Sequence, residues 1–520
     1  SLAANYKRKL MHVLMVAAEN DALPNAKVGG VADVIRDVPK ALVAQGLTVD
    51  VVIPDYGFEL GERCFIGEVS VAFKSETHVL SLFEIPQNQK GVRQIVISHP
   101  LFSQSLSVYC NDNDNRPFAT DATKFALFNA AICEALIQGV LTQPNTLHLH
   151  DWHSACVAVL LKFNPRYGKL AKLRLVYTVH NLALQGIRPF KGDDSSLEAW
   201  FPSLSYDGQR LCDPRYPHCF NPMRSAINLA DKVHVVSPSY SQEVQIASND
   251  AHGFFGGEGL ERDLQQAAEQ GKLIGILNGC DYAIQDEHEA TYSQLLEQIE
   301  STLFSWMAKS AQLHSSHYIA HQRVLQFMAC DKQGPLVTSV GRLTEQKVLL
   351  LCQQQSKDLT IDSVCQIINQ FKGRLLVLGS GDSKLEHLFT CAMARNNNFL
   401  FLKGYGQGVG DLMYQLGDLF LMPSSFEPCG ISQMLAMRAG QPCLVHSVGG
   451  LKDTVEHNVS GFCFNGDTLS TQADALLQSL TEALSLYQTN PKQWQAIKRR
   501  AADARFSWDS VVTDYITYLY

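Results

Sequence analysis

The chain has 520 residues, of which 46% are hydrophobic and 18% are charged. This length suggests about two to four domains, and the composition excludes a mainly disordered chain because a sizeable core can be buried. The net charge of −8 argues against sequence-independent nucleic-acid binding, which needs clustered cations.

The N-terminal region and the cysteines favour a reduced, cytoplasmic protein. The apolar run of residues 11–18 is too short for a signal peptide and continues into folded sequence. The sequence contains no run of about 18 apolar residues, which is the length that a membrane-spanning helix needs. The 14 cysteines form no Cys-x-x-Cys pair, and the prolines around Cys212, His218 and Cys219 favour a loop over a zinc site.

Short apolar runs alternate with helix-like stretches along the first half of the chain. Strands are predicted at residues 11–18, 49–53, 81–85, 94–98, 146–150, 175–179 and 232–237. Helices are predicted at residues 31–45 and 120–138. Strands separated by helices indicate a parallel sheet that is covered on both faces.

The same alternation returns in the second half. Strands are predicted at residues 336–340, 374–378, 399–402, 419–422 and 443–445, and helices at residues 433–438 and 471–486. A polar, glycine-rich stretch, residues 249–271, separates the halves, so we place a domain boundary near residue 245. The predicted fold class is therefore α/β, with two doubly wound domains whose intervening cleft is the expected site.

Three segments of the first half carry candidate site residues. Lys27-Val28-Gly29-Gly30 follows the first strand and precedes a helix, which suits an anion, although a tight turn with a solvated lysine is the alternative. At a later strand end, the segment from His148 to His153 suits a metal, a sugar-facing polar cluster or structural histidines. After the next strand, His180-Asn181 can hydrogen-bond a polyhydroxylated substrate or serve the core. The absence of G-x-G-x-x-G argues against a dinucleotide-dependent dehydrogenase.

Two segments of the second half are more specific. Arg342 and Lys347 flank a strand-to-helix turn, where both can reach a diphosphate, although a solvated basic face is the alternative. Glu427 lies in a turn between two prolines, and the backbone amides after it open a helix, where they suit a phosphate. Gly449-Gly450 forms another glycine turn before a helix.

As a set, these segments resemble the bacterial glycogen synthase and plant starch synthase family. The matching segments occur in the family's order and spacing, at residues 27–33, 150–153, 178–181, 236–240, 276–279, 342–347, 426–430 and 449–454. The resemblance implies the GT-B architecture, with two Rossmann-like domains facing across a cleft. Residues 1–245 would form the acceptor side, residues 246–498 the donor side, and residues 499–520 a helix crossing back to the first domain.

The resemblance also implies a retaining transfer of glucose from a nucleotide sugar, ADP-glucose in the bacterial type, to the non-reducing end of an α-1,4-glucan. No metal or bound cofactor is expected, and the partners are the glucan and the nucleotide sugar, without nucleic acid or membrane. The residues expected to carry catalysis are Glu427, Lys347, Arg342, His180 and Asp151. Those expected to bind the donor are Lys27, Gly29, Gly30, Asn278, Arg342, Lys347, Gly379, Tyr405, Glu427, Cys429, Gly430 and Ile431. Those on the acceptor side are Asp33, Asp151, Trp152 and Asn181.

Four departures from the family keep two alternatives open. Val348 stands where the family has Gly, Ser425 stands where it has Arg, and residues 223–227 replace its Lys-x-Gly-Ile pattern. The Trp-x-Pro that follows the family's Leu-Asn-Gly-x-Asp turn is absent from residues 282–289. One alternative is a non-catalytic glucan-binding or regulatory paralogue. The other is a transferase that uses another nucleotide sugar, such as UDP-glucose, or a small acceptor. The sequence favours an active enzyme because it retains Lys27, Arg342, Lys347 and Glu427.

Overall fold

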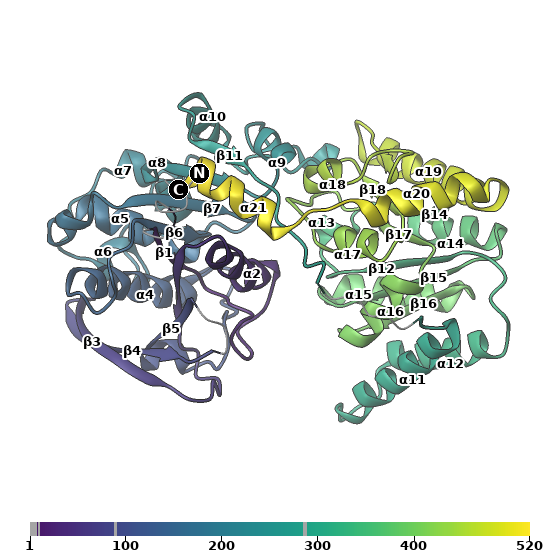
Figure 1. Cartoon of the computed structure of the whole chain (residues 1–520), viewed down its shortest axis with the longest axis horizontal. Coiled ribbons are helices and arrows are strands. Elements are labelled where there is room, and N and C mark those ends of the chain that lie inside the picture. The colour runs from purple at the N-terminus through teal and green to yellow at the C-terminus, as the bar shows by residue number, and fades with distance from the viewer. Residues whose placement is uncertain (1–7, 9–10, 88–90, 284–288) are drawn as a thin grey trace. The chain divides into compact units, whose positions relative to one another are not determined.

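The computed structural model describes residues 8, 11–87, 91–283 and 289–520. The chain divides into two compact units (Figure 1). Unit 1 contains the chain through Ser248, together with Gly256–Asn278 and Trp508–Tyr520. Unit 2 contains Asn249–Phe255 and Gly279–Ser507. In the ranges described, no helix is long and apolar enough to cross a membrane.

Unit 1 is built on a sheet that has nine strands among the described residues, in the order β11-β10-β7-β6-β1-β2-β5-β4-β3. The strands are β1 (His12–Val16), β2 (Thr48–Pro54), β3 (Cys64–Phe73), β4 (Glu76–Ile85), β5 (Val92–Ser98), β6 (Thr146–His150), β7 (Arg174–Val179), β10 (Lys232–Val235) and β11 (Leu273–Gly275). A separate small hairpin pairs β8 (Arg188–Pro189) with β9 (Cys219–Phe220). The helices are α2 (Gly30–Ala44), α3 (Pro100–Ser103), α4 (Ala119–Ile137), α5 (Cys156–Phe163), α6 (Leu197–Trp200), α7 (Gly208–Leu211), α8 (Pro222–Leu229), α9 (Pro238–Glu243), α10 (Glu261–Glu269) and α21 (Trp508–Asp514).

The sheet of unit 1 is parallel from β11 to β5, but β4 and β3 extend it in antiparallel fashion. The predicted parallel sheet is therefore confirmed from β11 to β5, and the two outer strands differ from it. Lys74 and Ser75 join β3 to β4 with φ values of 52° and 62°, and a two-residue turn of this kind can connect only antiparallel strands. The sequence analysis missed β3 because its exposed and buried residues alternate, so it contains no apolar run.

Unit 2 is built on a parallel sheet that has six strands in the described part of the chain, in the order β16-β15-β12-β17-β18-β19. The strands are β12 (Leu336–Val340), β15 (Arg374–Gly379), β16 (Phe399–Lys403), β17 (Leu419–Met422), β18 (Cys443–His446) and β19 (Gly461–Phe464), beside a small hairpin of β13 (Gln354–Gln355) and β14 (Asp358–Leu359). The helices are α11 (Tyr292–Ala308), α12 (Ser315–Met328), α13 (Glu345–Val348), α14 (Thr360–Gln370), α15 (Ser383–Arg395), α16 (Gln407–Leu416), α17 (Ser432–Arg438), α18 (Gly449–Thr454), α19 (Leu469–Thr489) and α20 (Pro491–Asp503). The predicted α/β class with doubly wound parallel sheets is confirmed for this unit.

The chain crosses from one unit to the other at residues that differ from the predicted ones. β11 pairs with β10 in parallel and extends the sheet of unit 1, so the boundary near residue 245 is placed too early. β11 has only three residues within a polar stretch, which hid it from the sequence analysis. The final passage comes after Ser507 rather than at residue 499, because α20 still belongs to unit 2. In Figure 1 the yellow α21 lies beside the purple α2 of unit 1.

Candidate active site

The loops that follow β12, β17 and β18 meet at one edge of the sheet of unit 2. These strands are neighbours and parallel, so their carboxyl ends lie together. Ser425 N donates to Gln346 O at 2.9 Å, which joins the loop after β17 to the turn containing Lys347. Gly450 N donates to Glu427 O at 3.1 Å, which joins the loop after β18. The structure thus brings together three segments that the sequence analysis singled out separately.

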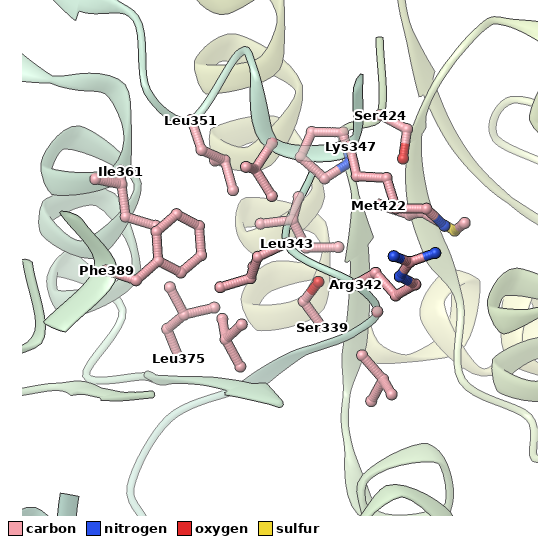
Figure 2. Close-up of a pocket in the computed structure, with 16 residues that line it drawn as sticks. Ser339, Arg342, Leu343, Lys347, Leu351, Ile361, Leu375, Phe389, Met422 and Ser424 are labelled. Carbon is pink, nitrogen blue, oxygen red and sulfur yellow. The ribbon is translucent and has the colours of Figure 1, made fainter. Parts of the chain in front are cut away.

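Lys347 and Glu427 form an ion pair within this group of loops. Lys347 Nζ lies 3.2 Å from Glu427 Oε2, and Ser424 Oγ donates to the same oxygen at 3.3 Å. Glu427 is only 7% exposed, and a buried carboxylate requires such partners. Arg342, Lys347 and Ser424 line one side of a pocket whose other side is apolar and includes Phe389 (Figure 2). The pocket therefore presents two cations beside a paired carboxylate.

Glycines hold these loops close to one another. A Cβ at Gly449, whose φ is +46°, would lie 2.0 Å from Glu427 O, and one at Gly450 would lie 2.1 Å from Cys429 O. A Cβ at Gly379 would lie 2.1 Å from Gly341 O. Side chains at these three positions would push the loops apart. These glycines therefore allow the close backbone approach that places Glu427.

The remaining predicted residues of unit 2 lie near the same edge. Gly404 N donates to Gly379 O at 3.2 Å, and the neighbouring Tyr405 is 72% exposed. Cys429 is buried, and Gly430 adopts a φ of +78° directly before Ile431, which precedes α17. An exposed aromatic ring and a glycine turn therefore lie at the same edge of the sheet as the ion pair.

The turn from Lys27 to Gly30 is held by carboxylates of its own chain. Glu19 Oε2 accepts from the amides of Val28 and Gly29, both at 2.7 Å. Lys27 Nζ donates to Asp33 Oδ1 at 2.6 Å. The sequence analysis assigned Asp33 to the acceptor side and missed Glu19, whose only signal was a carboxylate directly after a buried strand. Glu19 itself is 3% exposed, so it forms the buried floor of this turn.

A second group of predicted residues lies where β6 and β7 end. Asp151 Oδ1 accepts from His180 N at 2.8 Å, and His180 Nε2 lies 3.0 Å from His150 Nδ1. Burial raises the pKa of Asp151 to about 7, and it lowers the pKa of His180 to about 3. Asn181 Oδ1 accepts from Ala183 N at 2.7 Å and so shapes the loop. The structure therefore joins Asp151 and His180 as neighbours.

Two other predicted residues of unit 1 differ in their surroundings. Trp152 is only 5% exposed, and its ring packs against Phe118 and Phe125, so it belongs to the core of the unit. Asn278 Oδ1 is buried and has no hydrogen-bond partner among the described residues. An unsatisfied buried amide oxygen is unusual and is compatible with a ligand at this position.

The described residues contain no group of three His, Cys, Asp or Glu side chains arranged to hold a metal ion. The segment from His148 to His153 is therefore not part of such a ligand group among the described residues. Cys212 and Cys219 belong to no such group either. Instead, the rings of His148 and His150 stack on each other, with centroids 4.3 Å apart.

The departures from the family are accommodated locally. Val348 lies in α13, where it is 7% exposed and contributes to the core, and its φ is not positive. Ser425 is buried, and its Oγ has no partner within the described ranges. Residues 223–227 lie in α8, where Arg224 Nε donates to Asp263 at 3.0 Å. None of these three disturbs the contact between Lys347 and Glu427. The fourth departure, at residues 282–289, lies mostly outside the described residues.

Comparison with known proteins gives consistent matches along the chain. Residues 12–266 match the model of the starch synthase catalytic domain, and residues 326–500 match that of glycosyl transferases group 1. A glycogen synthase of Streptococcus gordonii is 32% identical, and one of Lactiplantibacillus plantarum is 31% identical. Both alignments cover 97% of this chain and 98% of the relative.

Among solved structures, the catalytic domain of starch synthase IV from Arabidopsis thaliana, bound to ADP and acarbose, matches with a TM-score of 0.73. It is 24% identical, and the match covers 98% of both chains, so it shows a shared fold. Sucrose-phosphate synthase from Thermosynechococcus elongatus matches with a TM-score of 0.57 at 17% identity over 98% of both chains.

Proposed function

The chain belongs to the glycogen synthase and starch synthase family of glycosyltransferases, and we propose that it transfers glucose from ADP-glucose to the non-reducing end of an α-1,4-glucan with retention of configuration. The glycogen synthases among its bacterial relatives support the glucan product. The starch synthase of similar fold is bound to ADP, the nucleotide that such a donor leaves behind.

The ion pair between Lys347 and Glu427, with Arg342 in the same pocket, carries this proposal. Arg342 and Lys347 neutralise the donor diphosphate, and no metal or cofactor is needed for this charge. Glu427 contacts the glucosyl hydroxyls. Cys429, Gly430 and Ile431 line the sugar and the phosphate. The exposed Tyr405 lies next to the adenine.

In unit 1, Lys27, Gly29, Gly30 and Asn278 serve the donor. His180 and Asp151 serve the glucose and the acceptor, with Asp33, Trp152 and Asn181 on the acceptor side. The buried, unpaired Asn278 Oδ1 supports a ligand contact there. Trp152 acts through its packing, because its ring is buried.

The transfer proceeds on one face of the sugar without a covalent enzyme intermediate. The acceptor hydroxyl attacks the anomeric carbon as its bond to the diphosphate breaks, and a phosphate oxygen of the departing ADP takes the hydroxyl proton. The protein then supplies positioning and charge stabilisation. A carboxylate paired with Lys347 is better suited to holding hydroxyl groups than to covalent attack, so Glu427 acts as a hydrogen-bond acceptor.

We also propose a cytoplasmic location. All 14 cysteines lie within the described residues, and all are free thiols. Free thiols throughout a chain are typical of a reducing compartment.

The test is incubation of the purified protein with glycogen and either ADP-glucose or UDP-glucose, in EDTA, with NMR analysis of the new linkage. We expect α-linked glucose from ADP-glucose and release of ADP. Transfer from UDP-glucose alone would overturn the donor assignment. Binding of glycogen without transfer from either donor would favour the non-catalytic paralogue.

A further inference from the structure

A directional chain of hydrogen bonds crosses the buried ends of β6, β7 and β10. Tyr520 Oη lies 2.7 Å from His148 Nδ1, and His148 Nε2 lies 2.6 Å from Thr178 Oγ1. Thr178 Oγ1 lies 2.9 Å from His234 Nδ1, and His234 Nε2 lies 3.0 Å from the carbonyl oxygen of Ile276. Both nitrogens of His148 and both of His234 are therefore engaged.

The carbonyl of Ile276 determines where the protons lie in this chain. A carbonyl only accepts, so His234 carries its proton on Nε2 and accepts at Nδ1 from the Thr178 hydroxyl. Thr178 Oγ1 then accepts from His148 Nε2, and the neutral His148 accepts at Nδ1 from Tyr520. Burial keeps both imidazoles neutral, because it lowers their pKa values.

His150 and His180 form a second pair that this chain does not reach. The ring of His150 stacks on that of His148 and on that of His180, with centroids 4.3 Å and 5.3 Å away. His150 Nδ1 and His180 Nε2 form one hydrogen bond, so one of these two nitrogens carries the proton and the other accepts it. His150 Nε2 is buried and has no partner among the described residues.

This unpartnered nitrogen decides the arrangement of the pair. If His180 donated, neutral His150 would carry its proton on Nε2 and would leave a buried N–H without an acceptor. If His150 donates from Nδ1, its Nε2 carries only a lone pair without a donor. Buried N–H groups without an acceptor are the rarer case in proteins, so donation from His150 is favoured. His180 then accepts at Nε2 and must carry its own proton on Nδ1.

We propose that His150 is a positioning residue that holds His180 as the Nδ1–H tautomer, so that His180 acts as a hydrogen-bond donor to an oxygen of the glucosyl group. This inference rests on the proposed function, which assigns His180 to the glucose side. His150 touches no substrate and acts through His180 alone. A fixed donor favours a substrate that places an oxygen at this point over an analogue that lacks it.

The direct test is ¹⁵N NMR of the full-length protein labelled in histidine, with assignments from His150→Asn and His180→Asn. We expect the His180 signals to show a protonated Nδ1 and an unprotonated Nε2. A His180 protonated on Nε2 would overturn the proposal, whether or not the enzyme transfers glucose. If His180 shows the expected tautomer but the protein transfers no glucose from ADP-glucose, the result counts against the proposed function and not against this inference.

Kinetics of His150 variants provide the second test. His150→Leu removes the donor to His180 and should lower kcat/KM for ADP-glucose about three- to tenfold, the range of one neutral hydrogen bond. His150→Asn places an amide N–H near the position of Nδ1 and should restore most of that loss. His234→Leu, equally buried but outside the pair, is the control, and it should leave His180 protonated on Nδ1. Equal kcat/KM values for His150→Leu and His150→Asn at matched thermal stability would contradict the positioning role.

Discussion

Lys347 Nζ lies 3.2 Å from Glu427 Oε2, although Lys347 belongs to the short helix α13 after β12 and Glu427 to the loop after β17. The pair gives a carboxylate that is only 7% exposed a cationic partner beside a pocket that is also lined by Arg342. Under the proposed function, the diphosphate and the sugar of the donor bind at this pair. When the donor binds, each of the two side chains replaces part of its contact with the other by a contact with the substrate.

The cations should dominate the rate of transfer. Replacing Lys347 or Arg342 by Ala should lower kcat by about 10²–10³, the effect of losing one transition-state donor, because the leaving diphosphate loses half of its neutralisation. Steady-state kinetics with ADP-glucose and glycogen measures this. Lys384→Ala removes an exposed cation of α15 and is the control. Equal losses in all three variants would contradict a specific role of the pocket.

The glycine at position 449 should tolerate no side chain. Gly449→Ala places a Cβ 2.0 Å from Glu427 O at a φ of +46°, so it should destabilise unit 2 by about 2 kcal/mol or more and displace Glu427. Chemical denaturation and the rate of transfer both report the change. Gly408→Ala, in the first turn of α16, meets nothing closer than 3.7 Å and should be neutral or slightly stabilising. A Gly449→Ala protein as stable and active as wild type would refute the predicted clash.

Glu19 should control how tightly the donor binds. Glu19→Ala frees the amides of Val28 and Gly29 from a charged acceptor, and each such bond contributes about 1.5–3 kcal/mol. The turn around Lys27 should then lose its position, so the KM for ADP-glucose should rise about tenfold or more while kcat changes little. Tyr109→Phe, which removes only the hydroxyl bonded to Glu19 Oε1 at 2.6 Å, should have a smaller effect. An unchanged KM in Glu19→Ala would show that the turn keeps its position without this carboxylate.

Unit 1 should lose stability in mild acid. Burial lowers the pKa values of six of its described histidines, including His153 and His180 to about 3 and His234 to about 4. Between those values and about 6.5, the unfolded chain binds more protons than the folded one, so stability falls as the pH is lowered through this range. Asp151, with its pKa raised to about 7, acts in the opposite direction, but this one carboxyl is opposed by six histidines.

Thermal unfolding between pH 8 and pH 5 checks this prediction. The melting temperature of unit 1 should drop as the pH is lowered, and His153→Phe should make the drop less steep because it removes one titrating group from an aromatic environment. A melting temperature that is constant over this range would show that the buried histidines do not bind protons on unfolding.

The sequence predicted the parts of the site that depend on strand ends. Arg342, Lys347 and Glu427 each follow an apolar run, and parallel strands bring such loops to one edge. The position of Asp151 beside His180 follows from the same rule, because β6 and β7 are neighbours.

Other contacts depend on packing that no local pattern records. Glu19 reaches amides that lie nine and ten residues further along the chain, and nothing in the sequence distinguishes it from other carboxylates near strands. The contact of Tyr520 with His148 joins residues that are 372 positions apart. β11 was missed because three residues carry too little periodicity to be recognised.

The most direct test of the central claim is incorporation of labelled glucose from ADP-glucose into glycogen by wild type, Lys347→Ala and Glu427→Ala, each checked for folding and for glycogen binding. The account predicts incorporation by wild type and its near-complete loss in both folded variants, with glycogen binding retained. Incorporation at the wild-type rate in either variant, or none by the wild type, would contradict it.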